Sequence, residues 1–247
     1  MKTVIIVQAR MTSTRLPGKV LKTVMGKPLL EYLIERLRRV KLADEIVIAT
    51  TTNTTDQPIL ELCRRLKVPV YRGSELDVLA RYHGAAEFYQ ADAVVRVTSD
   101  CPVIDPGVID QVISFFLNNW PNYDYVSNRL EASYPRGMDT EIFSYKSLNE
   151  AFLEAQEEAE REHVTPFMYW HSERYKLGNV AYLTDESCHR WTVDTQEDFE
   201  LIRRILESLY PDKPHFTLED ILNLLQQKLE WLKINAHVKQ KVVDRKG

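Results

Sequence analysis

Glycine is scarce in this sequence, and its scarcity excludes the two familiar phosphate-binding loops. Only 8 of the 247 residues are glycine, and no GxGxxG pattern occurs among them. The stretch "LPGKV" contains a Gly-Lys pair, but no glycine precedes Gly18 by five residues, and Val20 replaces the Ser or Thr of a Walker loop. Any phosphate group bound by this chain would therefore be held by cationic side chains and by backbone amides in turns.

Cysteine is scarce as well. The 3 cysteines, Cys63, Cys101 and Cys188, are far apart and form no CxxC pair. Neither a disulfide framework nor a cysteine zinc site is therefore expected, and a reducing cytoplasm is the predicted location. Five histidines show no partner pattern and are interpreted as structural, namely His83, His171, His189, His215 and His237.

The chain also lacks an excess of positive charge and long apolar runs. Its net charge is −4, which argues against general nucleic-acid binding, because phosphate-backbone affinity needs a surplus of Lys and Arg. No apolar run approaches 18 residues, and the N-terminus has no signal-peptide pattern, so neither membrane spanning nor export is expected. Cations are instead concentrated locally, as in "VQARMTSTRLPGKVL", where Arg10, Arg15 and Lys19 share one connection.

Short apolar runs alternate with amphipathic stretches through the first half of the chain. The β-branched runs predict buried strands at Thr3–Val7, Glu45–Thr50, 68–71 and Ala93–Ser99. Apolar residues at helical spacing, with prolines at several starts, predict helices at 28–40, 58–66, 76–89 and 106–116. This alternation predicts an α/β fold of βαβ units with a mostly parallel central sheet.

The pattern changes after Trp120. The strands "YDYVSNRL" and "MDTEIFSY" flank a Pro-Arg-Gly turn, and one charged helix, "EAFLEAQEEAERE", is predicted to follow. A strand at "RYKLGNVAYL" and a helix around Phe199 come later, and the polar tail from Asn235 is expected to fray. No linker interrupts the chain, so a single domain over residues 1–247 is expected, with parts at 1–120, 121–194 and 195–247.

Ligands of an open parallel sheet bind beyond the carboxyl ends of its strands. Four connections leave such ends and are therefore candidates for a site. They are Gln8–Gly18, Thr50–Asp56, Arg72–Asp77 and Thr98–Asp105. The first carries the cations, the second is rich in small hydroxyl side chains, and the last contains Asp100.

The stretch "QARMTSTRLPGKVL" resembles the signature loop of the sugar-acid cytidylyltransferases, the family of 3-deoxy-manno-octulosonate and acylneuraminate cytidylyltransferases. The resemblance is nearest to the branch of spore coat polysaccharide biosynthesis protein F. It extends over about residues 2–205, through "IVIATTTN", "VYRGSELDVLARY", "VRVTSDCPVIDP", "YPRGMDTEIFS", "REHVTP" and "WTVDTQEDFELI". Several segments in order are far more specific than one loop.

The resemblance implies a three-layer nucleotidyltransferase fold, like that of one large class of glycosyltransferases. It implies an enzyme that transfers CMP from CTP to a sugar or sugar acid and releases pyrophosphate, for cell-surface or spore-coat polysaccharide synthesis. Residues 1–120 would bind the nucleotide, and residues 121–194 would bind the acceptor and contribute to a homodimer.

The resemblance also assigns nucleotide-binding residues. Arg10, Arg15 and Lys19 match the phosphate-contacting cations and are the candidate catalytic residues, because fixed cations stabilise the charge that grows in the transition state. The other candidates lie in the signature loop or at later strand ends, and they are Gln8, Ala9, Ser13, Thr14, Thr50, Thr51, Thr52, Arg72, Asp77, Arg81 and Thr98. Arg72, Asp77 and Arg81 have a second interpretation, as mutual ion pairs around a helix start.

Asp100 and Asp194 match the family's metal-binding aspartates, and two carboxylates facing a triphosphate would suit Mg²⁺. Asp194 has an alternative role as the N-cap of the late helix. The acceptor candidates come from "YPRGMDTEIF" and "EREHVTP", and they are Arg136, Asp139, Glu141, Arg161 and His163. Either arginine would pair with the carboxylate of a sugar acid.

Two other functions fit parts of the pattern. A glycosyltransferase of the same fold would use a nucleotide sugar, but the DxD motif expected of it is missing around Asp100. A non-catalytic nucleotide-binding protein would not need all of the cations and both aspartates.

Overall fold

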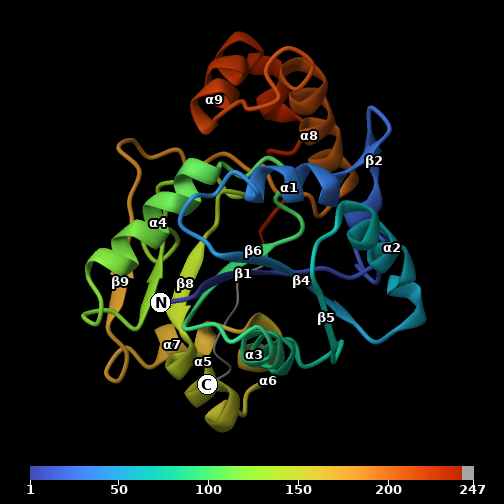
Figure 1. Cartoon of the computed structure of the whole chain (residues 1–247). Helices are drawn as coiled ribbons and strands as arrows, with labels where there is room; N and C mark the ends of the chain where they lie inside the picture. Colours follow the sequence, from blue (N-terminus) through green and yellow to red (C-terminus); the bar gives the residue numbers. More distant parts are fainter. Residues whose placement is uncertain (241–247) are drawn as a thin grey trace.

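The computed structural model describes residues 1–240 and contains one large central sheet (Figure 1). The order of its seven described strands is β5-β4-β1-β6-β8-β7-β9, and β8 is the one among them that runs antiparallel to its neighbours. Their bounds are β1 Thr3–Gln8, β4 Glu45–Thr51, β5 Val70–Gly73, β6 Ala93–Thr98, β7 Tyr125–Ser127, β8 Glu141–Ser144 and β9 Leu177–Asn179. The predicted α/β fold with a mostly parallel sheet is therefore confirmed.

Helices cover both faces of the sheet and make three layers (Figure 1). One face carries α1 Leu29–Leu37, α2 Gln57–Leu66, α4 Pro106–Asn118, α8 Gln196–Leu209 and α9 Leu218–Gln227. The other carries α3 Val78–Phe88, α5 Tyr145–Glu154 and α7 Pro166–Trp170, with α6 Glu158–His163 against α3. Short elements complete the described chain, namely the β2 Thr23–Val24 and β3 Lys27–Pro28 hairpin and the 3-10 turns Lys19–Leu21, Thr54–Asp56 and Leu229–Lys233.

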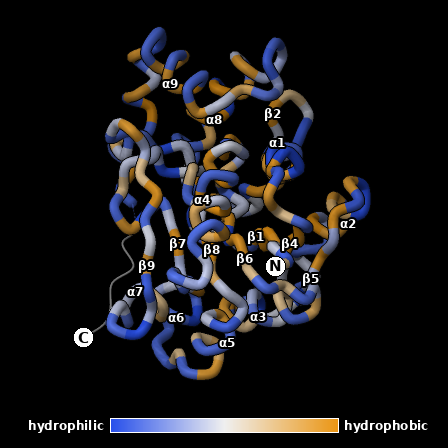
Figure 2. The backbone as a smooth tube through the Cα atoms, turned by 60° about the vertical axis from the view of Figure 1, so that its left-hand side comes forward, coloured by the Kyte–Doolittle hydropathy of each residue, from blue (hydrophilic) through white to orange (hydrophobic). Residues whose placement is uncertain are grey.

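The alternation of side chains along β1 explains the two cores. Successive side chains of a strand point to opposite faces, so Ile5 and Val7 join the core under α1 and α4, whereas Val4 and Ile6 join the core under α3 and α5. All four side chains are fully buried. Figure 2 shows the hydrophobic colour in the central strands, while the outer helices alternate between polar and apolar residues.

Two predictions about the second half need correction. The expected helix over residues 150–162 is two helices, because Ala155 is extended and Glu157 starts α6 with a capping box to Glu160. The strand expected over residues 174–183 is limited to β9. The two strands predicted around the Pro-Arg-Gly turn are confirmed as the shorter β7 and β8, which pair with each other and lie inside the sheet between β6 and β9.

The polar tail is anchored where the structure describes it. The Asn235 side chain is buried, and its amide donates hydrogen bonds to the Arg190 carbonyl and to Asp198 Oδ1, each at 2.9 Å. The expectation that the tail frays from Asn235 is therefore wrong for that residue. The expectation also covers residues 241–247, which lie outside the described residues. Among residues 1–240, no helix is both long enough and apolar enough to cross a membrane.

The order of the strands locates a candidate site. From β1 the chain moves to β4 and β5 on one side, and then crosses to β6 on the other side. Strand order therefore reverses between β1 and β6, which end at Gln8 and Thr98. Crevices at such a reversal are where open parallel sheets bind ligands.

Candidate functional site

A cavity of about 1240 Å³ lies beyond the carboxyl ends of β1 and β6. Three of the four predicted connections contribute to its wall, together with segments from the second half of the chain. The candidate residues that line it are Gln8, Ala9, Arg10, Ser13, Thr14, Arg15, Lys19, Asp77, Arg81, Thr98, Asp100, Arg136, Asp139, Glu141, Arg161, His163 and Asp194. The fold thus brings together residues that are far apart in the sequence.

The cationic loop after β1 is closed by a turn at Gly18. The amide of Gly18 donates to the Met11 carbonyl at 2.9 Å, and Gly18 adopts φ +68°, a left-handed conformation that glycine tolerates best. Lys19 then begins a 3-10 turn whose next side chain, Val20, is buried in the core. The loop therefore directs Lys19 into the cavity while Val20 anchors it.

Lys19 lies between two carboxylates. Its Nζ is 3.0 Å from Asp100 Oδ2 and 2.8 Å from Asp194 Oδ1. Burial alone would lower the pKa of Lys19, but the two carboxylates outweigh it and raise this pKa. Burial likewise opposes ionisation of Asp100, yet the charge of Lys19 and the hydrogen bonds from Thr98 and Lys19 hold the pKa of Asp100 at about 2. Lys19 and Asp100 are therefore both charged at neutral pH.

Asp194 is fixed by two arginines and by an aspartate side chain of α8. Arg15 Nη2 lies 3.0 Å from its Oδ2, and Arg190 Nη2 lies 2.7 Å from the same oxygen. Arg190 also binds the buried Asp198, whose carboxylate accepts from the Asp194 amide at 3.0 Å. Thr195, not Asp194, caps α8, so the alternative N-cap role of Asp194 is wrong.

Glu75 holds the cationic loop from the opposite wall. It accepts from Arg10 Nη1 at 3.4 Å, from the Thr12 hydroxyl, and from Asn53 Nδ2 at 2.5 Å. These contacts, the Thr12 hydrogen bond above all, lower the pKa of Glu75. Sequence reasoning did not select Glu75, although it lies in one of the four predicted connections.

The second predicted connection does not reach the cavity. The Thr50 and Thr51 hydroxyls are buried and donate to Asp56 Oδ2 at 2.9 and 2.6 Å, and Thr52 is exposed. Arg72 also lies outside the cavity wall, where its Nε donates to the Thr51 carbonyl at 3.0 Å. These side chains brace the end of β4.

Asp77 and Arg161 join the third connection to α6. Asp77 caps α3 by accepting from the Ala80 amide at 2.9 Å, and Arg161 Nη2 binds its carboxylate at 2.5 Å. Arg81 is buried and donates to the Ser74 carbonyl. The interpretation of Arg72, Asp77 and Arg81 as a mutual ion-pair cluster is therefore wrong, since Asp77 pairs with Arg161.

A second carboxylate network forms the far wall of the cavity. Glu141 forms an ion pair with Arg96 and accepts from the Tyr125 hydroxyl at 2.6 Å and the Thr165 hydroxyl at 2.7 Å. Sequence reasoning missed Arg96, although a single cation inside the apolar run "AVVRVTS" was a usable signal.

Beside this network, Asp139 lies between two arginines. Its Oδ1 is 3.3 Å from Arg129 Nε, and its Oδ2 is 3.3 Å from Arg136 Nη1. The pKa of Asp139 is nevertheless raised, because the effect of burial outweighs the opposing effect of the two cations. Arg129 was also missed, while His163 is part of the cavity wall with a 40% exposed side chain.

The donor set around Lys19 fits a divalent cation. Asp100 and Asp194 each direct a carboxylate oxygen to the same ammonium nitrogen, so both reach one point of the cavity. Hard oxygen ligands of this kind, with phosphate oxygens and water completing the shell, are what Mg²⁺ takes. Asp100 and Asp194 are thus the residues that could hold such an ion.

A model of the cytidylyltransferase family matches residues 4–240. The chain belongs to the cytidylyltransferase family. It is 38% identical over 244 residues to an uncharacterized protein of Methanocaldococcus jannaschii. The alignment covers 98% of this chain and 97% of that protein. It is 32% identical to spore coat polysaccharide biosynthesis protein SpsF of Bacillus subtilis, over 90% of this chain and 93% of that one. Membership of the family makes the chain a nucleotidyltransferase.

Two solved structures have the same fold as this chain. A cytidylyltransferase from Leptospira borgpetersenii superposes with a TM-score of 0.90 at 32% identity, over 99% of this chain and 100% of the other. CMP:2-keto-3-deoxy-manno-octonic acid synthetase complexed with CTP superposes with a TM-score of 0.63 at 19% identity, over 84% of this chain and 99% of the other. The predicted fold and the predicted family are both confirmed.

Proposed function

We propose that this cytidylyltransferase uses Mg²⁺ and CTP to transfer CMP to a sugar or sugar acid, with release of pyrophosphate. The observation that carries the proposal is the position of Lys19 between Asp100 and Asp194, at the reversal of strand order and inside the large cavity. The names of the spore coat relative and of the octonic acid synthetase support a sugar acceptor and CTP.

The loop cations would bind the triphosphate. Arg10, Arg15 and Lys19 all face the cavity and are each paired with a carboxylate there. A bound triphosphate would replace Glu75 as the partner of Arg10 and share Lys19 with the aspartates. Charge grows on the α-phosphate and on the leaving pyrophosphate during displacement, so these fixed cations would stabilise the transition state more than the ground state.

Asp100 and Asp194 would hold the Mg²⁺ ion. When bound, the ion would neutralise charge on the phosphate oxygens. The acceptor hydroxyl would attack the α-phosphorus as the bond to pyrophosphate breaks, and its proton would leave to a nearby base or to water.

The acceptor would lie on the far wall, near Arg136, Asp139, Glu141, Arg161 and His163. Arg129 and Arg136 offer two guanidinium groups to one region, and Asp139 lies between them. A planar carboxylate pairs well with such groups, which favours a sugar acid as the acceptor. Thr98 and Arg81 would contribute to the nucleotide side of the cavity.

The test is pyrophosphate release from each of the four nucleoside triphosphates, with Mg²⁺ and a panel of neutral sugars and sugar acids. Release is expected with CTP and a sugar or sugar acid, and with no triphosphate alone. Release with another triphosphate in preference to CTP would overturn the nucleotide assignment. If no combination releases pyrophosphate and no ligand raises the melting temperature, the proposed activity is overturned.

The cellular setting is part of the proposal. The sparse cysteines and the family's nucleotide chemistry favour a cytoplasmic enzyme of cell-surface or spore-coat polysaccharide synthesis, and the resemblance favours a homodimer. Light scattering after gel filtration tests the assembly, because the chain mass is 28.8 kDa and a dimer would have twice that mass.

A further inference from the structure

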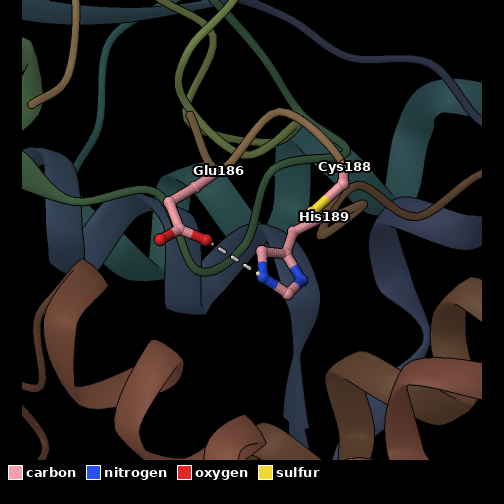
Figure 3. Close-up of side chains that lie close together, drawn as sticks. All are labelled: Glu186, Cys188 and His189. Atoms are coloured by element: carbon pink, nitrogen blue, oxygen red, sulfur yellow. Dashed lines mark ion pairs between the residues drawn. The ribbon is translucent and has the colours of Figure 1, made fainter. Parts of the chain in front are cut away.

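Three side chains that no part of the proposed reaction uses lie together in the loop between β9 and α8. They are Glu186, Cys188 and His189 (Figure 3). Each side chain offers one candidate ligand atom: a carboxylate oxygen, a thiol sulfur and a ring nitrogen. Within residues 1–240, this is the group of three whose ligand atoms all lie within 4.8 Å of one another. We propose that this group is a zinc site, separate from the carboxylates around Lys19.

The ligand types select zinc. A thiolate and an imidazole favour a borderline-soft ion such as Zn²⁺, whereas Mg²⁺ prefers oxygen alone. Zinc ligands lie about 2.0–2.3 Å from the ion, which for a tetrahedron places them about 3.5 Å apart. Glu186 Oε2 and His189 Nε2 are already 3.3 Å apart, and the sulfur of the exposed Cys188 lies within 4.8 Å of the other two ligand atoms. Three protein ligands leave the fourth position for water.

The backbone holds the ligands in a turn without any metal. The His189 amide donates to the Glu186 carbonyl at 3.1 Å, and the Glu186 amide donates to the Ser133 carbonyl at 2.8 Å. The His189 ring stacks on Trp191 with their centroids 5.6 Å apart. A preformed turn and a fixed ring reduce the entropy that zinc binding would cost.

Binding of zinc at this turn would release a proton. The Cys188 thiol would lose its proton to solvent when its sulfur binds the ion.

The position of the turn suggests what the ion does. The Arg136 amide donates to the His189 carbonyl at 2.9 Å, and Arg190 follows His189 directly and binds Asp194. Zinc at this turn would brace the segment that supports both Arg136 and Asp194 in the cavity. It would act as a structural ion and not in phosphoryl transfer.

The first experiment uses cobalt as a spectroscopic probe of the full-length protein after removal of metals with a chelator. Co²⁺ bound to a thiolate gives a charge-transfer band in the near ultraviolet, which binding to Asp100 and Asp194 would not give. The band should saturate at one equivalent per chain, vanish in Cys188→Ser and persist in Cys101→Ser. Cys188 is exposed, so its replacement should leave the fold intact. A band that survives Cys188→Ser would overturn the proposal.

The second experiment measures zinc affinity by competition with a chromophoric chelator. Cys188→Ser and His189→Gln should each weaken binding at least tenfold, whereas His215→Gln, which replaces an exposed histidine outside the group, should match the wild type. Equal affinities in the wild type and Cys188→Ser, or no stoichiometric binding by the wild type, would refute the site. Circular dichroism of His189→Gln separates lost ligation from lost folding.

Discussion

Lys19 links two aspartates that the sequence keeps far apart, and its removal would affect both. In Lys19→Ala, Asp100 and Asp194 lose their shared cation, and the proposed triphosphate site loses one of its three loop charges. We expect kcat to fall about 100-fold or more, the size of effect seen when one preorganised charge-stabilising group is removed. Steady-state pyrophosphate release measures this, with exposed Lys41→Ala as the matched control. Near-normal turnover would remove Lys19 from the mechanism.

Gly137 shows a steric requirement of the Pro-Arg-Gly turn. Its φ is +106°, and an added Cβ would lie 2.7 Å from the carbonyl carbon and oxygen of Trp191. Gly137→Ala would therefore force the two backbones apart. We expect a loss of about 3 kcal/mol in the free energy of unfolding, from backbone strain and overpacking together. Urea unfolding measures it.

Gly26→Ala is the control for the strain alone. Gly26 also has a positive φ, +76°, but a Cβ there would meet nothing within 4 Å. Its replacement should cost only about 1 kcal/mol, the penalty for a left-handed alanine. Equal losses in the two variants would show that the contact with Trp191 is unimportant.

Single residues were predictable from the sequence where a motif marked them. The signature loop, Asp100 and Asp194 follow predicted strand ends or lie in matched segments, and the structure brings them to one cavity. Arg190 and Asp198 were not selected, although Asp198 lies in the matched segment "WTVDTQEDFELI", because their roles come from ion pairs that form between a loop and a helix start only in the folded chain. Thr50 and Thr51 were selected as nucleotide-binding candidates, but their hydroxyls turn inward and donate to Asp56.

At the scale of elements, Asp56 ties the end of β4 to the cationic loop. Its carboxylate is fully buried and accepts from the Thr50 and Thr51 hydroxyls, the Thr51 amide and the Met11 amide. Burial opposes its charge, but these hydrogen bonds outweigh burial and lower the pKa of Asp56. The folded state therefore favours the ionised carboxylate more than the unfolded state does.

The sign of this shift predicts an acid-dependent contribution to stability. The contribution is fully present above the unfolded pKa of about 3.9 and is lost as pH falls through the lower folded pKa. Asp56→Asn should therefore unfold about 1–3 kcal/mol more easily at pH 7, with the difference narrowing below about pH 4. Urea titrations across pH measure it, and exposed Asp212→Asn should follow the wild type. A difference that is constant with pH would exclude ionisation as the cause.

Elements were predictable where local pattern and packing agree. The four parallel strands of the first half and their helices match the apolar periodicity, since each strand is covered on both faces. The break between α5 and α6 was not predictable from periodicity, because "EAFLEAQEEAERE" is helix-forming throughout and the break depends on the Glu157 cap. The short length of β9 was not predictable from the sequence either, because it depends on pairing with β7 over three residues.

At the scale of the whole molecule, the cavity draws on nearly the full chain. Its wall runs from Gln8 to Gln240 and includes ends of the parallel strands, the Pro-Arg-Gly turn, α6 and the segment before α8. A ligand that fills it would therefore contact elements of the first, middle and last parts together. Binding energy in such a site stabilises the native state as a unit, because the unfolded chain offers no equivalent surface.

This arrangement predicts a thermal shift specific to the nucleotide. At a free CTP concentration of 100 times Kd, with Mg²⁺ present, stabilisation of about 2.7 kcal/mol is expected. For a chain of this size that raises Tm by about 5–10 °C. Differential scanning fluorimetry should show the shift with CTP and smaller shifts with ATP, GTP and UTP. Lys19→Ala should lose most of it, because the cation between the two aspartates contributes to holding the phosphates. An equal shift with all four triphosphates would mean that the cavity recognises phosphate without selecting cytosine.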